Sequence, residues 1–152
     1  MGFLLGKAHR ARKRAWEAEL ADLGLTAHQA ALLRALTTEP GSGVRHLART
    51  LGTDVMNVQR IAGTLIAAGL CVTTQDPADA RRHPLHPTAE GNRLAKIVAH
   101  RAAASEENLS AVLGPQRYAA MVKGLQQLLA QDDPPPAREV TAQLRPEHSG
   151  SP

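Results

Sequence analysis

The sequence predicts a mainly α-helical fold, a winged helix-turn-helix in which a small β-hairpin forms the wing. Apolar residues recur with helical spacing along most of residues 3–129, and only three aromatic side chains occur, so the core must be aliphatic, as in helix-on-helix packing. The segment 76–88, D-P-A-D-A-R-R-H-P-L-H-P-T, joins turn formers to adjacent arginines directly after a helix-turn-helix pattern. A basic loop in this position can bind phosphates and the narrow minor groove of DNA.

The first two helices are predicted from their periodicity and from their ends. Residues 3–23 form one amphipathic pattern, and Gly24 is suited to end it. Thr26 opens the second helix, with Gln29 three residues later in the capping-box position. The segment 39–43, E-P-G-S-G, ends this second helix.

Two further helices follow with a tight turn between them. Ser42 or Gly43 is expected to cap the third helix, Gly52 breaks it, and Thr53 is expected to cap the fourth. The fourth helix is closed by Gly69 and presents polar residues near its start, while its apolar residues face inward. Two helices joined in this way form a helix-turn-helix, in which the second is the recognition helix.

A β-hairpin is expected after the fourth helix. Residues 70–75 predict a strand, residues 76–79 a turn and residues 81–87 the returning strand. Pro84 and Pro87 cannot donate hydrogen bonds within a sheet, and their odd separation would place the two missing N–H groups on opposite edges. The sequence therefore predicts a hairpin that is short or irregular.

Two helices and a tail complete the chain. Thr88 caps a long helix that runs to about Leu113, and Gly114 and Pro115 break the chain and start the last helix. Residues 132–152 contain three consecutive prolines and end in Ser-Gly-Ser-Pro. Such a composition cannot bury enough apolar surface to order a chain, so a disordered tail is expected.

The charge of the chain is compatible with a nucleic-acid partner. The net charge is +4 and the pI about 9.8, and residues 131–152 hold four acidic and two basic side chains, so the positive charge lies in residues 1–130. No apolar run reaches membrane-spanning length, and charge follows the apolar start of the chain at once, unlike in a signal peptide. We expect a cytoplasmic protein without a membrane partner.

Candidate catalytic and metal sites are weak. Cys71 is the single cysteine and excludes a disulfide framework; it is either a redox switch or a buried inert thiol, and the lack of an obvious neighbouring base favours the second. His83 and His86 have the spacing of a metal pair, but no further ligand follows, so no metal site is expected. Because no glycine-rich phosphate loop, nucleophile elbow or H-E-x-x-H motif occurs, we expect neither an enzyme nor a cofactor.

Four short motifs occur in a fixed order along the chain: L-A-R-T-L-G at 47–52, A-G-L at 68–70, D-P-A-D-A-R at 76–81 and T-A-E-G at 88–91. Together they resemble the MarR family of bacterial transcriptional regulators. The resemblance implies a homodimer that binds double-stranded DNA and has no catalytic activity. It places the recognition helix of each protomer in a major groove and the wing near a minor groove.

The resemblance covers about residues 1–130 and implies a domain organisation. Residues 1–24 would form an N-terminal dimerisation helix and residues 89–131 the C-terminal dimerisation helices. Residues 25–88 would form the winged helix-turn-helix DNA-binding domain, and residues 132–152 would remain the disordered tail.

Candidate DNA-binding residues follow from these two elements. Asn and Gln side chains suit adenine and Arg suits guanine, so the start of the fourth helix is expected to face the bases. In the wing, the resemblance implies that the Asp79 carboxylate orients the Arg81 guanidinium that enters the minor groove. The complete set is Thr53, Asp54, Met56, Asn57, Gln59, Arg60, Asp79, Arg81, Arg82 and His83.

Two further groups of residues have competing interpretations. The family resemblance implies a cleft for small, commonly aromatic acids, which Arg12, Trp16 and His28 would line as an effector site; core packing is the alternative for Trp16. The basic run at residues 7–14 is a second phosphate contact, or a solvated face with salt bridges to a partner helix, and its place in the dimerisation region favours the latter.

The expected function is a sequence-specific DNA-binding transcriptional regulator. It would act as a repressor, as a homodimer on a pseudo-palindromic operator, with release by a small organic effector as one mode of regulation. The alternative is a dimeric protein-interaction module of the same fold, with weakened or lost specific DNA binding. Pro84 and Pro87 in the expected wing favour that alternative.

Overall fold

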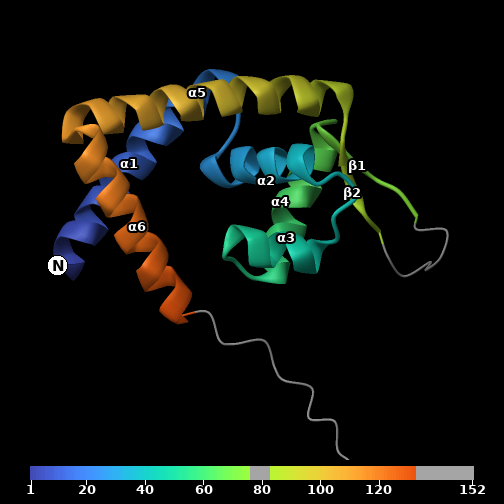
Figure 1. The fold of residues 1–152 in the computed structure, drawn as a ribbon. Coiled ribbons are helices and arrows are strands. Elements are labelled where there is room, and N and C mark those ends of the chain that lie inside the picture. The colour runs from blue at the N-terminus through green and yellow to red at the C-terminus, as the bar shows by residue number, and fades with distance from the viewer. Residues whose placement is uncertain (76–82, 133–152) are drawn as a thin grey trace, which may run out of the picture. The chain divides into compact units, whose positions relative to one another are not determined.

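The helices and strands of the computed structural model confirm a mainly α-helical fold with a two-stranded hairpin (Figure 1). The structure describes residues 1–75 and 83–132. Contacts divide the chain into two units, residues 1–107 and residues 108–152. The elements in order are α1 (Gly2–Leu20), the 3-10 helix η1 (Ala21–Leu23), α2 (Ala27–Thr38), α3 (Val44–Leu51), α4 (Val55–Ala67), β1 (Cys71–Thr73), β2 (Leu85–Pro87), α5 (Ala89–Leu113) and α6 (Pro115–Asp132).

The ends of the first two helices largely follow their local sequence. The helix expected over residues 3–23 is in fact α1 followed by the tighter turn of η1, and Gly24 ends it in the left-handed conformation at φ +64°. The capping box of α2 is confirmed, because the Thr26 hydroxyl accepts from the Gln29 backbone N–H at 3.3 Å and the Gln29 carboxamide oxygen accepts from the Thr26 N–H at 2.8 Å.

The caps of α3 and α4 correct one expectation. Gly43 is the N-cap residue of α3, and Gly52 ends α3 at φ +61°. The expected cap of α4, Thr53, is wrong: Asp54 is the N-cap residue, and its carboxylate accepts from the Asn57 backbone N–H at 2.7 Å. Both residue types can cap, but the helix begins one residue later than expected, which gives the role to Asp54.

The hairpin is short and its pairing is regular. Strands β1 and β2 are antiparallel over three residue pairs, Cys71 with Pro87, Val72 with His86 and Thr73 with Leu85. The predicted short hairpin is confirmed, whereas the strand expected over residues 81–87 was too long. Pro84 lies outside β2, where its carbonyl oxygen still accepts from the Thr74 N–H at 3.1 Å.

The other edge of β2 explains why the strand tolerates a proline. The Leu85 N–H donates to the Ser42 carbonyl at 3.2 Å, and the Gly41 N–H donates to the Leu85 carbonyl at 2.9 Å. Because N–H directions alternate along a strand, the missing N–H of Pro87 points to this second edge and not toward β1. The loop between α2 and α3 is thereby fastened to the wing.

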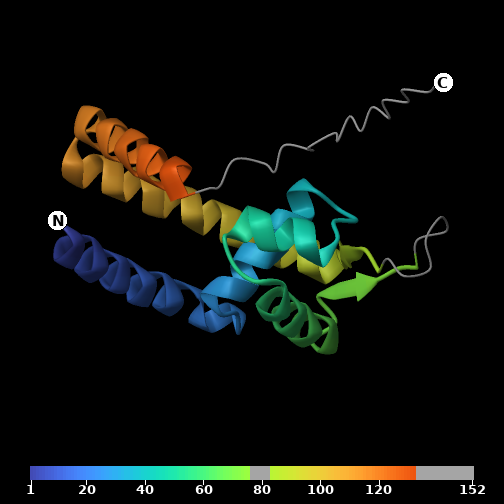
Figure 2. The ribbon, with the colours of Figure 1, turned by 90° about the horizontal axis from the view of Figure 1, so that it is seen from below.

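The hydrophobic core lies between α2, α4 and the first half of α5. Figure 2 shows α3 and α4 next to each other, with β1 leading away from the end of α4. All the core side chains are apolar, and among the described residues no polar or charged residue is buried. The fully buried leucines and valines are Leu20, Leu32, Leu33, Leu36, Leu47, Val58, Leu65, Leu85 and Val98.

Glycine and threonine hold the start of α5 against the end of α4. The Thr88 hydroxyl donates to the Gly69 carbonyl at 2.8 Å and accepts from the Gly91 N–H at 3.1 Å, so Thr88 caps α5 as expected. A Cβ at Gly91 would lie 2.0 Å from the Leu70 carbonyl oxygen. Only glycine permits this close approach of helix and backbone.

The second unit contains the end of α5 and all of α6. Gly114 adopts φ +81° and Pro115 is the first residue of α6, as predicted for this break. Asp132 is the last residue of α6, and the expected disordered tail otherwise lies outside the described residues. Large apolar side chains of this unit are exposed, namely Val112, Met121, Leu125, Leu128 and Leu129.

Candidate nucleic-acid interface

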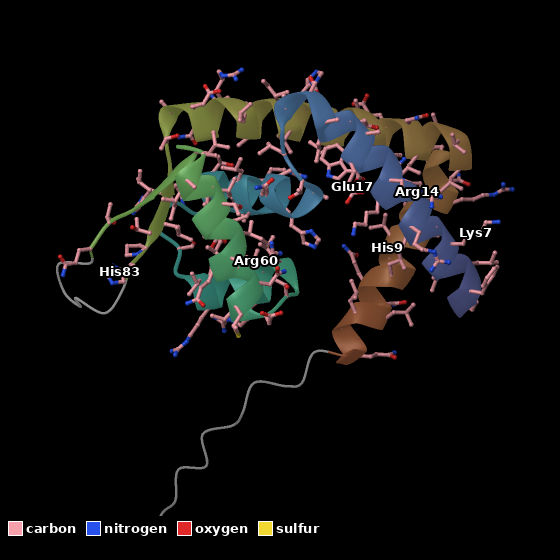
Figure 3. The ribbon with its side chains drawn as sticks, turned by 180° about the vertical axis from the view of Figure 1, so that it is seen from behind. Lys7, His9, Arg14, Glu17, Arg60 and His83 are labelled. Carbon is pink, nitrogen blue, oxygen red and sulfur yellow. The ribbon has the colours of Figure 1, made fainter. Side chains whose placement is uncertain are left out.

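The start of α4 presents polar side chains to solvent directly after the tight turn that follows α3. Asp54, Gln59 and Arg60 are exposed, and Met56 is 80% exposed, which is unusual for a large apolar side chain. Figure 3 shows Arg60 on α4. Most of the predicted fourth-helix residues are therefore accessible to solvent.

Thr53 and Asn57 differ from their neighbours because both are half-buried. The Asn57 side-chain amide donates to the Thr53 hydroxyl at 2.9 Å. The Asn57 carboxamide oxygen accepts from the Arg60 guanidinium Nη2 at 2.7 Å. The three side chains form one hydrogen-bonded chain along the start of α4, which was not predicted from the sequence.

Of the predicted wing residues, His83 lies in the described part of the chain. His83 is exposed and lies next to β2 at the end of the hairpin (Figure 3). The other wing candidates, Asp79, Arg81 and Arg82, lie outside the described residues. His86 is half-buried beside the α2–α3 loop, where a Cβ added to Gly41 would lie 3.1 Å from its Cε1 atom.

The residues expected to form an effector site come together. Arg12 and Trp16 of α1 line both of two cavities, of about 200 and 440 Å³, and His28 of α2 lines the larger one. Trp16 also packs against the core, as the alternative interpretation of this residue predicts. Arg34 and Ser105 of the smaller cavity were not predicted, because only the packing of α5 on α2 brings them there.

Hydrogen bonds of two arginine side chains join α5 to α1 and η1. The Arg12 guanidinium donates to the Ser105 hydroxyl, and the Arg101 guanidinium binds both carboxylate oxygens of Asp22 at 2.6 and 2.7 Å. The hydrogen bond from Arg101 holds the pKa of the Asp22 carboxyl below its usual value. These contacts set the position of α5 as a wall of the smaller cavity.

The basic side chains of residues 7–14 on α1 are exposed, except for the half-buried Arg12. Figure 3 shows Lys7, His9 and Arg14 along this helix. Lys13 forms an ion pair with Glu17 at 3.8 Å, one turn further along the helix. An exposed ion pair of this kind contributes little stability. The two interpretations of the run, a phosphate contact or a solvated face with salt bridges to a partner helix, stay predictions.

Cys71 is buried, with 1% of its surface exposed. Burial raises the pKa of the thiol to about 11, which keeps the side chain protonated at neutral pH. The prediction that this thiol is buried is confirmed. Among the residues that the structure describes, no three His, Cys, Asp or Glu side chains lie together as they would in a metal site.

No helix in the described ranges is long and apolar enough to cross a membrane.

Comparison with the curated proteins finds no match. Residues 23–82, which span α2, the helix-turn-helix and β1, match the family model described as the MarR family.

Several solved structures share the fold over most of the chain. MepR of S. aureus, in a complex with DNA, has a TM-score of 0.81 at 19% identity, with 87% of this chain and 97% of that chain covered. The transcriptional repressor CouR, bound to a 23-mer DNA duplex, has a TM-score of 0.79 at 28% identity, with 85% and 92% covered. The PcaV transcriptional regulator from Streptomyces coelicolor, in complex with its natural ligand, has a TM-score of 0.72 at 25% identity, with 84% and 93% covered. The chain is thus similar to the MarR family over residues 23–82, and it shares the fold of solved transcriptional regulators over most of its length.

Proposed function

We propose that this protein is a sequence-specific DNA-binding repressor that acts as a homodimer on a pseudo-palindromic operator in the cytoplasm. The observation that carries the proposal is the exposed face at the start of α4, where Gln59 and Arg60 follow the turn of a helix-turn-helix. Side chains in this position reach base edges when the helix enters a major groove. MepR and CouR, which share the fold, are DNA complexes.

The wing adds contacts to the minor groove in this proposal. Arg81, oriented by Asp79, enters the groove, while Arg82 and His83 contact phosphates or sugars. An arginine held by a carboxylate loses less conformational entropy on docking. The regular pairing of β1 with β2 gives the wing a firm base despite Pro84 and Pro87.

Exposed apolar side chains support a homodimer formed by helices from both ends of the chain. On α1, Phe3 is 76% and Leu4 66% exposed. On α6, Leu128 is 50% and Leu129 70% exposed. Apolar stripes of this kind are covered by a partner in a dimer. Each protomer then binds one half-site, with half-site centres about 34–36 Å apart along the DNA.

The cavities beside α1 and α2 suit a small aromatic acid as effector. Arg12 and Arg34 supply two guanidinium groups against one carboxylate, Glu106, and Trp16 supplies an aromatic surface. His28 lines the larger cavity and adds a polar group. PcaV, which shares the fold, holds its natural ligand. Binding here would displace α2 and with it the recognition helix.

DNA binding is tested by titrating the protein with duplexes from the promoter of its own and adjacent genes over a salt series. The repressor proposal predicts a specific complex whose affinity falls steeply as salt rises, because phosphate contacts release counterions. Absence of a specific complex at low salt would favour the interaction module. The irregular hairpin that favoured this module is not seen in the described strands.

The effector proposal is tested on the same complex with benzoate, and with benzamide as its neutral analogue. Benzoate should release the DNA and benzamide should not, because only the carboxylate pairs with guanidinium groups. Arg12→Gln should abolish the effect of benzoate, whereas Lys7→Gln, on the same helix and outside the cavities, should leave it unchanged. An equal effect of benzoate on wild type and Arg12→Gln would refute the site.

A further inference from the structure

The hydrogen bonds of Asn57 involve the same two groups that it would use in base readout. Its carboxamide must point its oxygen toward Arg60, since a guanidinium only donates, and its NH2 group toward the Thr53 hydroxyl, which accepts. Bidentate recognition of adenine requires the same oxygen and the same NH2 group. Each contact uses one of the two N–H donors or one of the two lone pairs of the carboxamide, and together they fix its orientation between Thr53 and Arg60, so reading a base would compete with them.

Arg60 has the opposite properties. Its side chain is exposed, and the bond to Asn57 uses one N–H of the five that a guanidinium carries. The remaining donors are sufficient for bidentate recognition of guanine O6 and N7. A guanidinium that is already held in place loses less side-chain entropy when it docks.

We propose that Thr53 and Asn57 are positioning residues that hold Arg60 for base contact, and that Asn57 does not itself read a base. Asp54 supports the arrangement, because its cap on the Asn57 backbone N–H fixes the first turn of α4. This inference rests on the proposed DNA-binding function. It assigns sequence preference at one base pair to the whole Thr53–Asn57–Arg60 chain.

The experiment first selects a motif from a pool of random duplex DNA with the full-length wild-type protein. Affinities of the variants are then measured for the selected duplex and for each single base-pair change. Arg60→Ala should lower the preference at one base pair about tenfold or more. Asn57→Ala and Thr53→Val should lower the preference at the same base pair, and Asn57→Ala should add nothing to Arg60→Ala.

Gln59→Ala is the matched control, because Gln59 is an exposed neighbour on α4 outside the hydrogen-bonded chain. Its effect should add to that of Arg60→Ala, as for independent sites. Thr53→Val keeps the shape of the side chain and provides a second variant if Asn57→Ala folds poorly.

Loss of preference at a different base pair in Asn57→Ala, or additivity of Asn57→Ala with Arg60→Ala, would show that Asn57 reads DNA and would overturn the inference alone. If the wild-type protein enriches no motif, both the proposed function and this inference are overturned.

Discussion

Gln29 on α2 donates a hydrogen bond from its side-chain amide to the Thr64 hydroxyl on α4, with Nε2 and Oγ1 3.0 Å apart. The oxygen of the same carboxamide closes the capping box with Thr26. The neighbours of Gln29, Ala27 and His28, line the larger cavity. One side chain thus joins the start of α2, beside this cavity, to α4.

Thr64→Val should weaken this junction between α2 and α4. The variant removes the acceptor for Gln29 and the intrahelical bond to the Ile61 carbonyl, and should lower the free energy of unfolding by about 0.5–1.5 kcal/mol. Urea denaturation measures the change. Thr50→Val is the control, since no hydrogen bond joins the exposed Thr50 side chain to another described residue. Equal losses in both variants would mean that the junction contributes nothing.

Gly91→Ala should destabilise the protein strongly. The added Cβ would meet the Leu70 carbonyl oxygen, a backbone atom that cannot move aside, so we expect a loss of about 3 kcal/mol or more. Gly63→Ala in α4 is the matched control, because nothing lies within 4 Å of the added Cβ there. That variant should gain about 0.5–1 kcal/mol from helix propensity. Thermal unfolding of both variants gives the comparison, and a tolerated Gly91→Ala would contradict the close approach.

Arg81→Ala should weaken DNA binding mainly at operators with an A·T-rich narrow minor groove, because such grooves attract guanidinium groups. We expect about a tenfold loss there. Fluorescence anisotropy with operator duplexes that differ only in this flank measures it. Arg82→Ala should lose affinity to a similar extent on all duplexes, as expected for a phosphate contact. If Arg81→Ala lost the same affinity on all duplexes, Arg81 would also be a phosphate contact.

Cys71 should react slowly in the folded protein. A rise in its pKa from 9.0 to about 11 lowers the thiolate fraction at pH 8 about a hundredfold, and iodoacetamide reacts with the thiolate. Mass spectrometry of native and urea-unfolded protein should show this contrast. Fast alkylation of the folded protein at neutral pH would favour the interpretation of Cys71 as a redox switch.

The raised pKa of the Cys71 thiol should make the stability of the protein depend on pH. Because the folded state holds the proton more tightly, the contribution of Cys71 is fully present below pH 9.0 and is lost as the pH rises through about 11. The stability difference between wild type and Cys71→Ala, from urea titrations at pH 8 and 10.5, should therefore shrink at the higher pH. A constant difference would argue against a raised pKa.

The predictable part of the fold depends on residues close in sequence. The capping box of Thr26 and Gln29, the cap at Thr88 and the break at Gly114 and Pro115 involve partners at most a few positions apart. Such signals can be read without knowledge of the tertiary structure. The N-cap of α4 could not be predicted in this way, since Thr53 and Asp54 are both good capping residues and only the register of α4 distinguishes them.

The candidate site, like the fold, could be predicted from the sequence only in part. The exposed positions of α4 follow from helical periodicity, so Gln59 and Arg60 were predicted correctly as exposed residues. The half-burial of Asn57 between Thr53 and Arg60 depends on side-chain directions that periodicity does not give. Arg34 joined the cavity because α5, more than sixty residues further along the chain, packs beside it.

Local sequence was enough to predict the helices, their order, the family motifs and a basic loop after the helix-turn-helix. These depend on local propensity and spacing. How the hairpin accommodates its prolines became clear from its contacts in the folded chain. Its second edge pairs through Leu85 with Gly41 and Ser42, about forty residues earlier in the chain, and the missing N–H of Pro87 faces that edge, where it leaves the pairing of β1 with β2 intact. Long-range pairing of this kind is set by packing, which no local pattern encodes.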